Sequence, residues 1–425
     1  MQQETQIVTF EKFVFGGDCL GRLPDGRAVF VPFALPGEVA EIEITESKER
    51  FARGRVVNLL KSSPDRLEAP CPYFSMCGGC HYQHIDYTQQ LNLKRELVKD
   101  QLARIGKLSN VPDIQITASP LPFGYRNQVQ FHPTNLNNEE IIPSLGFKRA
   151  NSDEVLPIKK CLLVPDEINQ LLAQIELEPY SDLSRITMRI DSDGELMLIF
   201  SGESDEPPDL SIELPVSSAY LSPDGQSYSL SGNDALIYTV LGKEFLISPE
   251  SFFQVNLPVA EAMLCHVLAL IEKQHGMNIL ELYSGAGLFT RFLAPHAIQL
   301  TAIESSPSAC FDFVSNLDEF DNISLYEGAV EDILPGIVAE IKPVDLVVLD
   351  PPRAGLNVKA RQALIDLKPQ EIIYISCDPS TLARDLKHLI EAGYELENIH
   401  AFDMFPQTAH VETMTVLRRT QRVTS

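Results

Sequence analysis

The cysteine at position 377 could act as a nucleophile. It lies between an apolar run and a segment typical of a helix that begins near Pro379 or Ser380, in EIIYISCDPSTLARDL. A cysteine just before a helix N-terminus experiences the helix dipole, which favours the thiolate, the nucleophilic form. A lone cysteine is more often a small buried residue. The polar continuation after Cys377 favours the nucleophile.

An acidic residue ends the preceding apolar run. Asp350 is followed by two prolines and an arginine in VDLVVLDPPRAGL. In open α/β sheets, ligands bind at the carboxyl ends of strands, and the two prolines would hold the carboxylate at a fixed angle. An aspartate before proline often only starts a turn. The position of Asp350 relative to the glycine turn upstream favours a role in ligand binding or catalysis. The Asp-Pro-Pro sequence resembles the motif of methyltransferases that modify a planar nitrogen or a nucleobase.

A glycine turn lies further upstream. Gly285 and Gly287 follow an apolar run in NILELYSGAGLFT, and Glu304 ends the next run. The glycines would let a ligand approach the backbone, and an acid at this distance can bind both hydroxyls of a ribose. Dinucleotide-binding enzymes and S-adenosylmethionine methyltransferases both use this arrangement. Thr290 replaces the third glycine of the dinucleotide motif, which favours a methyltransferase over a dehydrogenase.

A cysteine nucleophile has a specific use in such an enzyme. Carbon 5 of uracil or cytosine is a poor nucleophile until a thiolate adds to carbon 6. After methylation a base must remove the carbon-5 proton so that the thiolate can leave. Glu412, in DMFPQTAHVETMTVL, is the candidate base, and His410 is the lesser one. Taken alone, a His-Val-Glu triplet at the start of a strand more often consists of exposed residues with no catalytic role.

A second group of cysteines has the spacing of metal ligands. Cys71, Cys77 and Cys80 lie within ten residues, and Cys161 lies far downstream. Four thiolates could bind a [4Fe–4S] cluster or a structural zinc ion. Spacing alone does not separate the two, and His81 and His84 keep a Cys/His zinc site open. A redox Cys-x-x-Cys is less favoured, because no thioredoxin-like pattern surrounds it.

The elements that must position these residues follow from the patterns. Five or so short strands with glycine and proline turns over residues 7–58 predict a small β-barrel. Residues 86–107 have a helical pattern, and residues 113–245 predict a β-rich region. From about residue 258, short apolar runs alternate with helical segments, which predicts a parallel sheet with helices on both faces.

The composition limits the classes of protein. With 425 residues and 44% hydrophobic residues, the chain is neither disordered nor fibrous as a whole. No transmembrane segment and no signal peptide are found, so we expect a cytoplasmic protein with reduced or metal-bound cysteines. The net charge of −25 argues against nucleic-acid binding. However, residues 1–160 are neutral overall, and the acidity lies in residues 161–425.

Taken together, these motifs resemble the RNA 5-methyluridine methyltransferases that carry an iron–sulfur cluster. The likeness covers almost the whole chain and rests on motifs in the family's order: CPYFSMCGGCHYQH with Cys161, GYRNQVQF, SFFQVN, LELYSGAGLFT, LDPPRAGL, SCDPSTLARD and FPQTAHVET. It implies an OB-like TRAM barrel over residues 1–62, a β-rich central domain with the cluster over 63–250, and a doubly wound, Rossmann-like methyltransferase domain over 251–425.

The resemblance also implies roles for individual residues. Cys377 would be the nucleophile and Glu412 the base. The four cysteines Cys71, Cys77, Cys80 and Cys161 would bind a [4Fe–4S] cluster. S-adenosylmethionine would be contacted by Gln254, Tyr283, Gly285, Gly287, Glu304, Gly328 and Asp350. The flipped uracil would be held by Arg126, Gln254 and Asp350. Leu288 departs from the family, which often has Asn there, so one cofactor hydrogen bond is in doubt.

The expected reaction is methylation of carbon 5 of a uridine in structured ribosomal or transfer RNA, by a monomeric enzyme with no membrane partner. The RNA-facing residues would include Arg22, Arg53, Arg55, Lys94, Arg95 and Arg126. Three alternatives stay open: an RNA 5-methylcytidine methyltransferase, a non-catalytic iron–sulfur RNA-binding protein and an iron–sulfur electron carrier. The first would typically have a second cysteine near Asp350, the second would have no need for Cys377 with Glu412, and the third would need no cofactor pocket.

Overall fold

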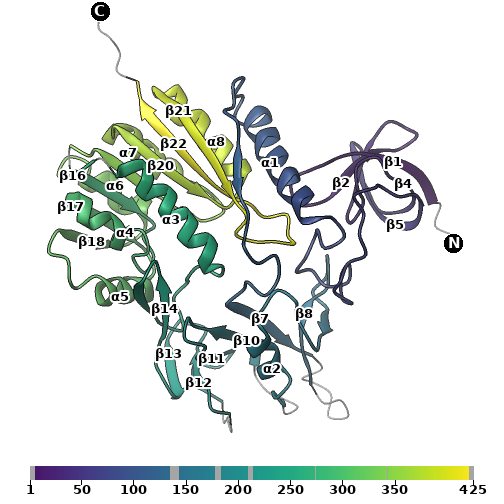
Figure 1. Ribbon diagram of the computed structural model, residues 1–425, viewed down its shortest axis with the longest axis horizontal. Helices are drawn as coiled ribbons and strands as arrows, with labels where there is room; N and C mark the ends of the chain where they lie inside the picture. Colours follow the sequence, from purple (N-terminus) through teal and green to yellow (C-terminus); the bar gives the residue numbers. More distant parts are fainter. Residues whose placement is uncertain are drawn as a thin grey trace, which may run out of the picture.

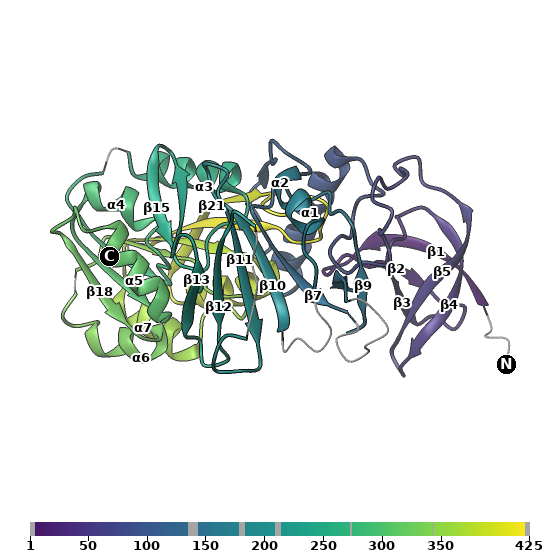
Figure 2. The same cartoon turned by 90° about the horizontal axis from the view of Figure 1, so that it is seen from below.

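A computed structural model describes residues 5–134, 143–177, 183–208, 214–272, 274–341 and 343–420. The molecule is elongated, with a β-barrel at one end, a large α/β unit at the other and a second sheet between them (Figures 1 and 2). Among the described residues, no helix combines the length and the apolar character needed to cross a membrane.

The N-terminal barrel closes in the strand order β1-β2-β3-β5-β4. Its strands are β1 (Thr5–Phe13), β2 (Cys19–Arg22), β3 (Ala28–Val31), β4 (Val39–Ser47) and β5 (Phe51–Lys61). Alternate side chains such as Val8, Phe10, Val29 and Ile42 fill its interior. The predicted small barrel is confirmed.

The central region forms a seven-stranded sheet with the order β13-β12-β11-β10-β7-β8-β9. The strands are β7 (Gln128–Pro133), β8 (Leu145–Lys148), β9 (Val155–Pro157), β10 (Leu183–Ile190), β11 (Leu196–Gly202), β12 (Ser217–Leu221) and β13 (Ser227–Ser231). The helix α2 (Asp166–Leu172) packs against it through Ile168, Leu171 and Leu172. The predicted β-rich region is confirmed.

The large unit contains an eight-stranded sheet, ordered β18-β17-β16-β19-β20-β22-β21-β6. Its strands are β6 (Gln115–Thr117), β16 (Met277–Leu282), β17 (Ala297–Glu304), β18 (Ile323–Glu327), β19 (Leu346–Leu349), β20 (Glu371–Ser376), β21 (Tyr394–Phe402) and β22 (Glu412–Arg419). The five strands from β18 to β20 are parallel, as predicted. The sheet as a whole is mixed, because residues 403–411 join β21 to β22 and so short a connection can only join antiparallel neighbours.

Helices cover both faces of this sheet, as predicted. One face is packed by α3 (Leu257–Ile271), α4 (Thr290–Leu293) and α5 (Pro307–Asn316), together with the hairpin β14 (Leu236–Val240) and β15 (Lys243–Ile247). A short 3₁₀ helix, η1 (Ala294–His296), follows α4. The other face is packed by α6 (Val330–Ile337), α7 (Val358–Leu367) and α8 (Pro379–Glu391).

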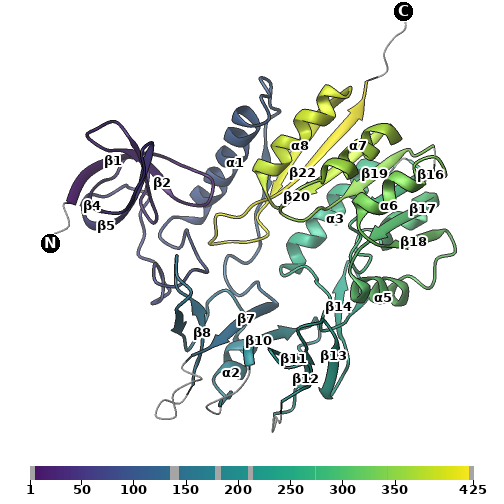
Figure 3. The same cartoon turned by 180° about the vertical axis from the view of Figure 1, so that it is seen from behind.

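Two elements from the N-terminal half also belong to this unit. Strand β6 pairs with β21 at the edge of the sheet. The helix α1 (Tyr87–Arg104) packs beside α8, and its Val98 and Leu102 share a core with Leu386 (Figure 3). The β21–β22 loop therefore lies against residues that precede it by about 300 positions.

Candidate active site and cysteine cavity

Three reactive side chains meet at one edge of the large sheet. Asp350 directly follows β19 and Cys377 directly follows β20, at the carboxyl ends of neighbouring parallel strands. Strand β22 begins at Glu412 and runs antiparallel to β20, with Thr413 opposite Ser376. This register brings Glu412 alongside Cys377. The carboxylates of Glu412 and Asp350 both act on the Cys377 thiol electrostatically, so the residues predicted for catalysis are indeed brought together.

The two acids are held in a poorly solvated environment. Glu412 is buried and its Oε2 has no hydrogen-bond partner. Burial, and then the charge of Asp350, raise the pKa of Glu412 well above its usual value, because two neighbouring carboxylates resist ionising together. Burial also raises the pKa of Asp350 to about 6.

Other groups around Cys377 oppose the expected effect of the helix dipole, which would favour the thiolate. Helix α8 does begin at Pro379, but the side chain of Asp378 already accepts hydrogen bonds from the N–H groups of Ser380 and Thr381. The negatively charged side chain of Asp378 thus already occupies the positive end of the helix. Burial, Glu412 and Asp350 raise the pKa of the Cys377 thiol to about 12, so the resting thiol keeps its proton at neutral pH.

Arg353 also belongs to the site, although no role is expected for it from the sequence. Its charge counteracts the rise in the pKa of both Cys377 and Glu412. Its Nη2 lies 3.5 Å from Nε2 of His410. Burial, and then Arg353, lower the pKa of His410 to about 4, so this histidine is neutral at physiological pH. The sequence signal was available, because Arg353 follows the Asp-Pro-Pro strand end directly.

The glycine turn and Glu304 form one polar cradle. Oε2 of Glu304 accepts the N–H of Gly285 (2.8 Å), and Oε1 accepts the N–H groups of Ser305 and Ser306 (2.7 Å each). A Cβ added to Gly285, which has φ +56°, would meet nothing within 4 Å, so the backbone there is open to a ligand. The N–H of Gly328 donates to the Glu304 carbonyl (2.7 Å).

The residues next to Gly285 differ in their surroundings, and some of them serve to pack the core. A Cβ on Gly287 would lie 2.6 Å from the Leu317 side chain, so this glycine allows close packing of α5. Tyr283 has φ +62° and continues β16 into the turn. Leu288 is buried in the hydrophobic core beside α3, α4 and α5. The residue that departs from the family pattern is therefore a core residue here.

The four predicted metal-ligand cysteines line one cavity of about 570 Å³. The Gly79 N–H lies 3.4 Å from Sγ of Cys77, and Nε2 of Gln83 donates to Sγ of Cys80 (3.1 Å). Oε1 of the same Gln83 accepts the N–H of Cys71 (3.2 Å). Cys161 is held from the far side of the cavity, where Asn169 of α2 binds both its N–H and its carbonyl.

The two histidines near these cysteines lie outside the cavity. His84 is buried with its ring against Phe74 and Phe33. Nδ1 of His81 accepts the N–H of Ala409 (3.3 Å). Neither histidine lines the cavity. Over the part of the chain that the structure describes, no three Cys, His, Asp or Glu side chains are grouped so as to hold a single metal ion.

Arg126 and Gln254 lie in the segments that join the two sheets. Arg126 lines the cysteine cavity, and its guanidinium carbon lies 5.8 Å from the ring centre of Phe405, in the loop before Glu412. The half-buried Gln254 lies three residues before the start of α3, and its carbonyl accepts a hydrogen bond from Nδ2 of Asn127 (3.0 Å). Arg126 therefore lies between the cysteine cavity and the loop that contains Phe405 and leads to Glu412.

The prediction that Lys94 faces RNA is wrong. Lys94 is fully buried and forms an ion pair with the equally buried Asp403. The three barrel arginines expected to face RNA are exposed, but each also pairs with a carboxylate: Arg22 with Glu11, Arg53 with Asp18 and Arg55 with Glu43. A pair between two exposed side chains, such as Arg22 with Glu11, is weak and can exchange partners at little cost.

Comparison with known proteins matches both ends of the chain to family models. The model for the TRAM domain matches residues 1–57, and that for tRNA (Uracil-5-)-methyltransferase matches residues 239–420. An uncharacterized RNA methyltransferase of Aquifex aeolicus is 34% identical over 434 residues, covering 98% of this chain and 99% of the relative. One of Thermotoga maritima is 33% identical over 447 residues, covering 98% and 99%.

Among solved structures, the tRNA (uracil-54, C5)-methyltransferase of Pyrococcus abyssi, in complex with S-adenosyl-L-homocysteine, is similar along almost its whole length. Its TM-score is 0.73 at 26% sequence identity, and the match covers 96% of this chain and 99% of the other. The similarity thus extends over the barrel, the central sheet and the α/β unit together.

Proposed function

The chain belongs to the RNA uracil-5-methyltransferase family with an N-terminal TRAM domain, and on that premise we propose that Cys377 and Glu412 perform its covalent chemistry. The enzyme methylates carbon 5 of a uracil in RNA and uses S-adenosylmethionine as the methyl donor. This decides against the cytidine-modifying and the non-catalytic alternatives. The convergence of Cys377, Asp350 and Glu412 at one sheet edge is the observation that carries the assignment of roles.

The proposed reaction has three steps. The thiol of Cys377 gives its proton to water and its sulfur bonds to carbon 6, while the electron pair of the 5,6 double bond moves toward carbon 5 and the carbon-4 carbonyl. S-adenosylmethionine supplies an electrophilic methyl group, which bonds to carbon 5 as its bond to the donor sulfur breaks. Glu412 then takes the carbon-5 proton, the double bond re-forms, and the carbon–sulfur bond breaks with its electron pair returning to Cys377.

The other predicted residues would bind and orient the two reactants. The open backbone at Gly285 and the fixed carboxylate of Glu304 support a ribose contact, with Tyr283, Gly287 and Gly328 around it. We assign Asp350, Gln254 and Arg126 to the uracil, which must leave its stack to reach Cys377. Arg353 would favour the thiolate when it forms, because its positive charge lowers the pKa of Cys377.

We further propose that the cysteine cavity binds a [4Fe–4S] cluster. Four thiols line it, two sulfurs lie within hydrogen-bonding distance of N–H donors, and the histidines that a Cys/His zinc site would need lie elsewhere. A cluster needs more room than one ion, which fits a cavity of this size. When bound, it would tie residues 71–80 to Cys161. No catalytic step is assigned to it.

Anaerobically purified protein should therefore contain about four iron atoms per chain and absorb broadly in the visible range. Replacing the cavity cysteine Cys80 by serine should lower the iron content strongly. The same change at Cys265, an exposed cysteine on α3, should leave it unaltered. Metal analysis and absorption spectra measure both. Stoichiometric zinc without iron would overturn the cluster assignment.

The domain boundaries near residues 62 and 250 stay a prediction.

The target is proposed to be a uridine in structured ribosomal or transfer RNA, contacted by the barrel and the central region. Mapping of 5-methyluridine in total RNA from cells with and without the protein should reveal one or a few positions that lose the methyl group. No difference between the two RNA samples would contradict the proposal of a ribosomal or transfer RNA target.

A further inference from the structure

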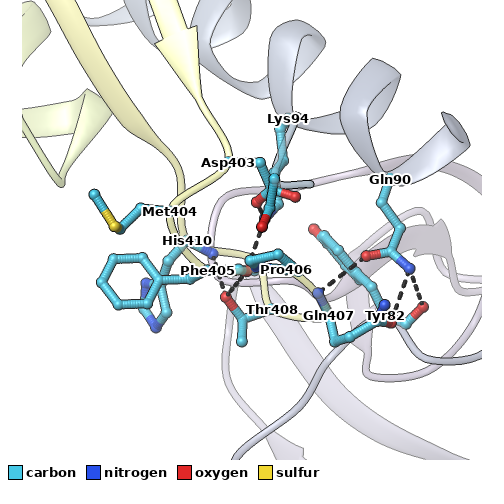
Figure 4. A network of polar contacts seen from close by, with 12 residues as sticks. Tyr82, Gln90, Lys94, Asp403, Met404, Phe405, Pro406, Gln407, Thr408 and His410 are labelled. Carbon is cyan, nitrogen blue, oxygen red and sulfur yellow. Dashed lines mark hydrogen bonds and ion pairs between the residues drawn. The ribbon is translucent and has the colours of Figure 1, made fainter. Parts of the chain in front are cut away.

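The loop of residues 403–411, which leads directly into Glu412, is held from outside (Figure 4). Its four consecutive carbonyls from Met404 to Gln407 each accept a hydrogen bond from the preceding parts of the chain. The donors, in the same order, are Nδ2 of Asn256, Nζ of Lys94, the hydroxyl of Tyr125 and the N–H groups of both His81 and Tyr82. The loop is therefore shaped by residues that lie more than 140 positions before it.

Gln407 is the point at which this support is densest. It has φ +67°, a left-handed conformation that a residue with a side chain adopts only when its surroundings enforce it. The amides of Gln90 and Gln407 pair reciprocally: Nε2 of Gln90 donates to Oε1 of Gln407 (2.9 Å), and the Gln407 N–H donates to Oε1 of Gln90 (3.2 Å). Nε2 of Gln407 also donates to the carbonyl of Pro122 (3.3 Å).

The beginning of the loop is fixed by a buried ion pair. Lys94 and Asp403 are both completely inaccessible to solvent, and Nζ of Lys94 also donates to the carbonyl of Phe405 (3.0 Å). A buried pair of this kind adds little net stability, because desolvation offsets the attraction. It joins the middle of α1 to the first and third residues of the loop.

The base and the nucleophile depend on this loop to different extents. Glu412 is the first residue after the loop, and its Oε2 has no hydrogen bond of its own to orient it. The orientation of the Glu412 carboxylate therefore depends on its backbone and on the side chains packed beside it. Cys377 follows β20, which is flanked by β19 and β22 inside the sheet and does not belong to the loop.

We propose that Gln90 and Lys94 of α1 are positioning residues for Glu412, setting the rate of adduct release but not of adduct formation. This inference rests on the proposed roles of Cys377 and Glu412. In the affected step, Glu412 accepts the carbon-5 proton, the 5,6 double bond re-forms, and the bond from carbon 6 to the Cys377 sulfur breaks. A base that is displaced slightly slows this step, because proton transfer requires close contact.

The test uses the full-length protein, total RNA from cells lacking it, and S-adenosylmethionine labelled in the methyl group. The share of label that stays with the protein on a denaturing gel measures the unreleased adduct. Gln90→Leu and Lys94→Met should raise this share about tenfold over the unaltered protein. Gln101→Leu is the matched control, since Gln101 is a buried glutamine of the same helix whose side chain bonds Asp100, outside the loop. Its adduct share should be unchanged.

The possible outcomes separate the inference from the function. If Gln90→Leu and Lys94→Met slow the reaction while the adduct share stays at the unaltered level, the positioning role is wrong. If Glu412→Gln raises the share and these variants do not, only the inference fails. If Glu412→Gln also leaves it unchanged, the proposed base fails. If both α1 variants are insoluble, Tyr125→Phe replaces them, because it removes the hydroxyl that binds the carbonyl of Pro406. A raised adduct share in this variant would support the positioning role, and an unchanged share would contradict it.

Discussion

Replacing Cys377 by alanine should lower methyl transfer by about 10⁴-fold or more, as loss of a covalent nucleophile does in other enzymes. Without the sulfur, carbon 5 of uracil never gains the electron density that it needs to attack the methyl group. Neither carboxylate at the site can replace it, because both have raised pKa values and are weaker nucleophiles than a thiolate. Incorporation of labelled methyl groups into RNA measures the loss.

Binding of S-adenosylhomocysteine to the Cys377→Ala protein should be preserved, because the Glu304 cradle lies on other strands. Calorimetric titration checks this. Cys265→Ala, on the exposed side of α3, is the matched control and should keep full activity. Methyl transfer by Cys377→Ala at more than a few per cent of the normal rate would remove Cys377 from the mechanism.

Glutamine at position 412 should trap the enzyme on its RNA. The amide has the shape of the carboxyl group but cannot take the carbon-5 proton, so addition and methyl transfer proceed and release stops. Turnover should fall by about 10²–10⁴-fold, the usual contribution of a general base. A methylated protein–RNA adduct that survives denaturation should accumulate to nearly one per enzyme. Rapid multiple turnover by Glu412→Gln would contradict the role of the base.

The same substitution should not destabilise the fold. The folded-state pKa of Glu412 is raised, so the folded protein binds this proton more tightly than the unfolded chain does. Above the unfolded-state pKa, ionisation of Glu412 therefore costs stability, and this cost is absent in glutamine. A melting temperature at neutral pH equal to or above that of the unaltered protein is expected, which also separates a chemical defect from a folding defect.

Local patterns sufficed to predict the parts of the fold in which neighbours in sequence are neighbours in space. The turns of the barrel and the alternation after residue 258 are of this kind. Strand β6 was not predictable as part of the large sheet, because three residues carry no periodicity and their partner β21 begins at residue 394.

In the candidate site, too, some features follow from local sequence patterns and others depend on residues far apart in the sequence. Asp350, Cys377 and Glu412 follow or begin apolar runs, so a sheet edge brings them together. The burial of Lys94 depends on Asp403, 309 positions later, and an amphipathic helix gives no sign of which lysine is inside. The raised pKa of Cys377 does not follow from the sequence, because its main causes are burial and the nearby carboxylates of Glu412 and Asp350, which come together only in three dimensions.

The insertion of α1 and β6 into the large unit has a consequence for synthesis on the ribosome. Strand β6 ends at Thr117, and its partner β21 begins at Tyr394. At about 5–20 residues per second, α1 and β6 wait roughly 14–55 s for the strand and the helix that they pack against. The barrel can close during this time, because its five strands are contiguous. The apolar side of α1, with Val98 and Leu102, therefore stays uncovered on the growing chain until α8 emerges.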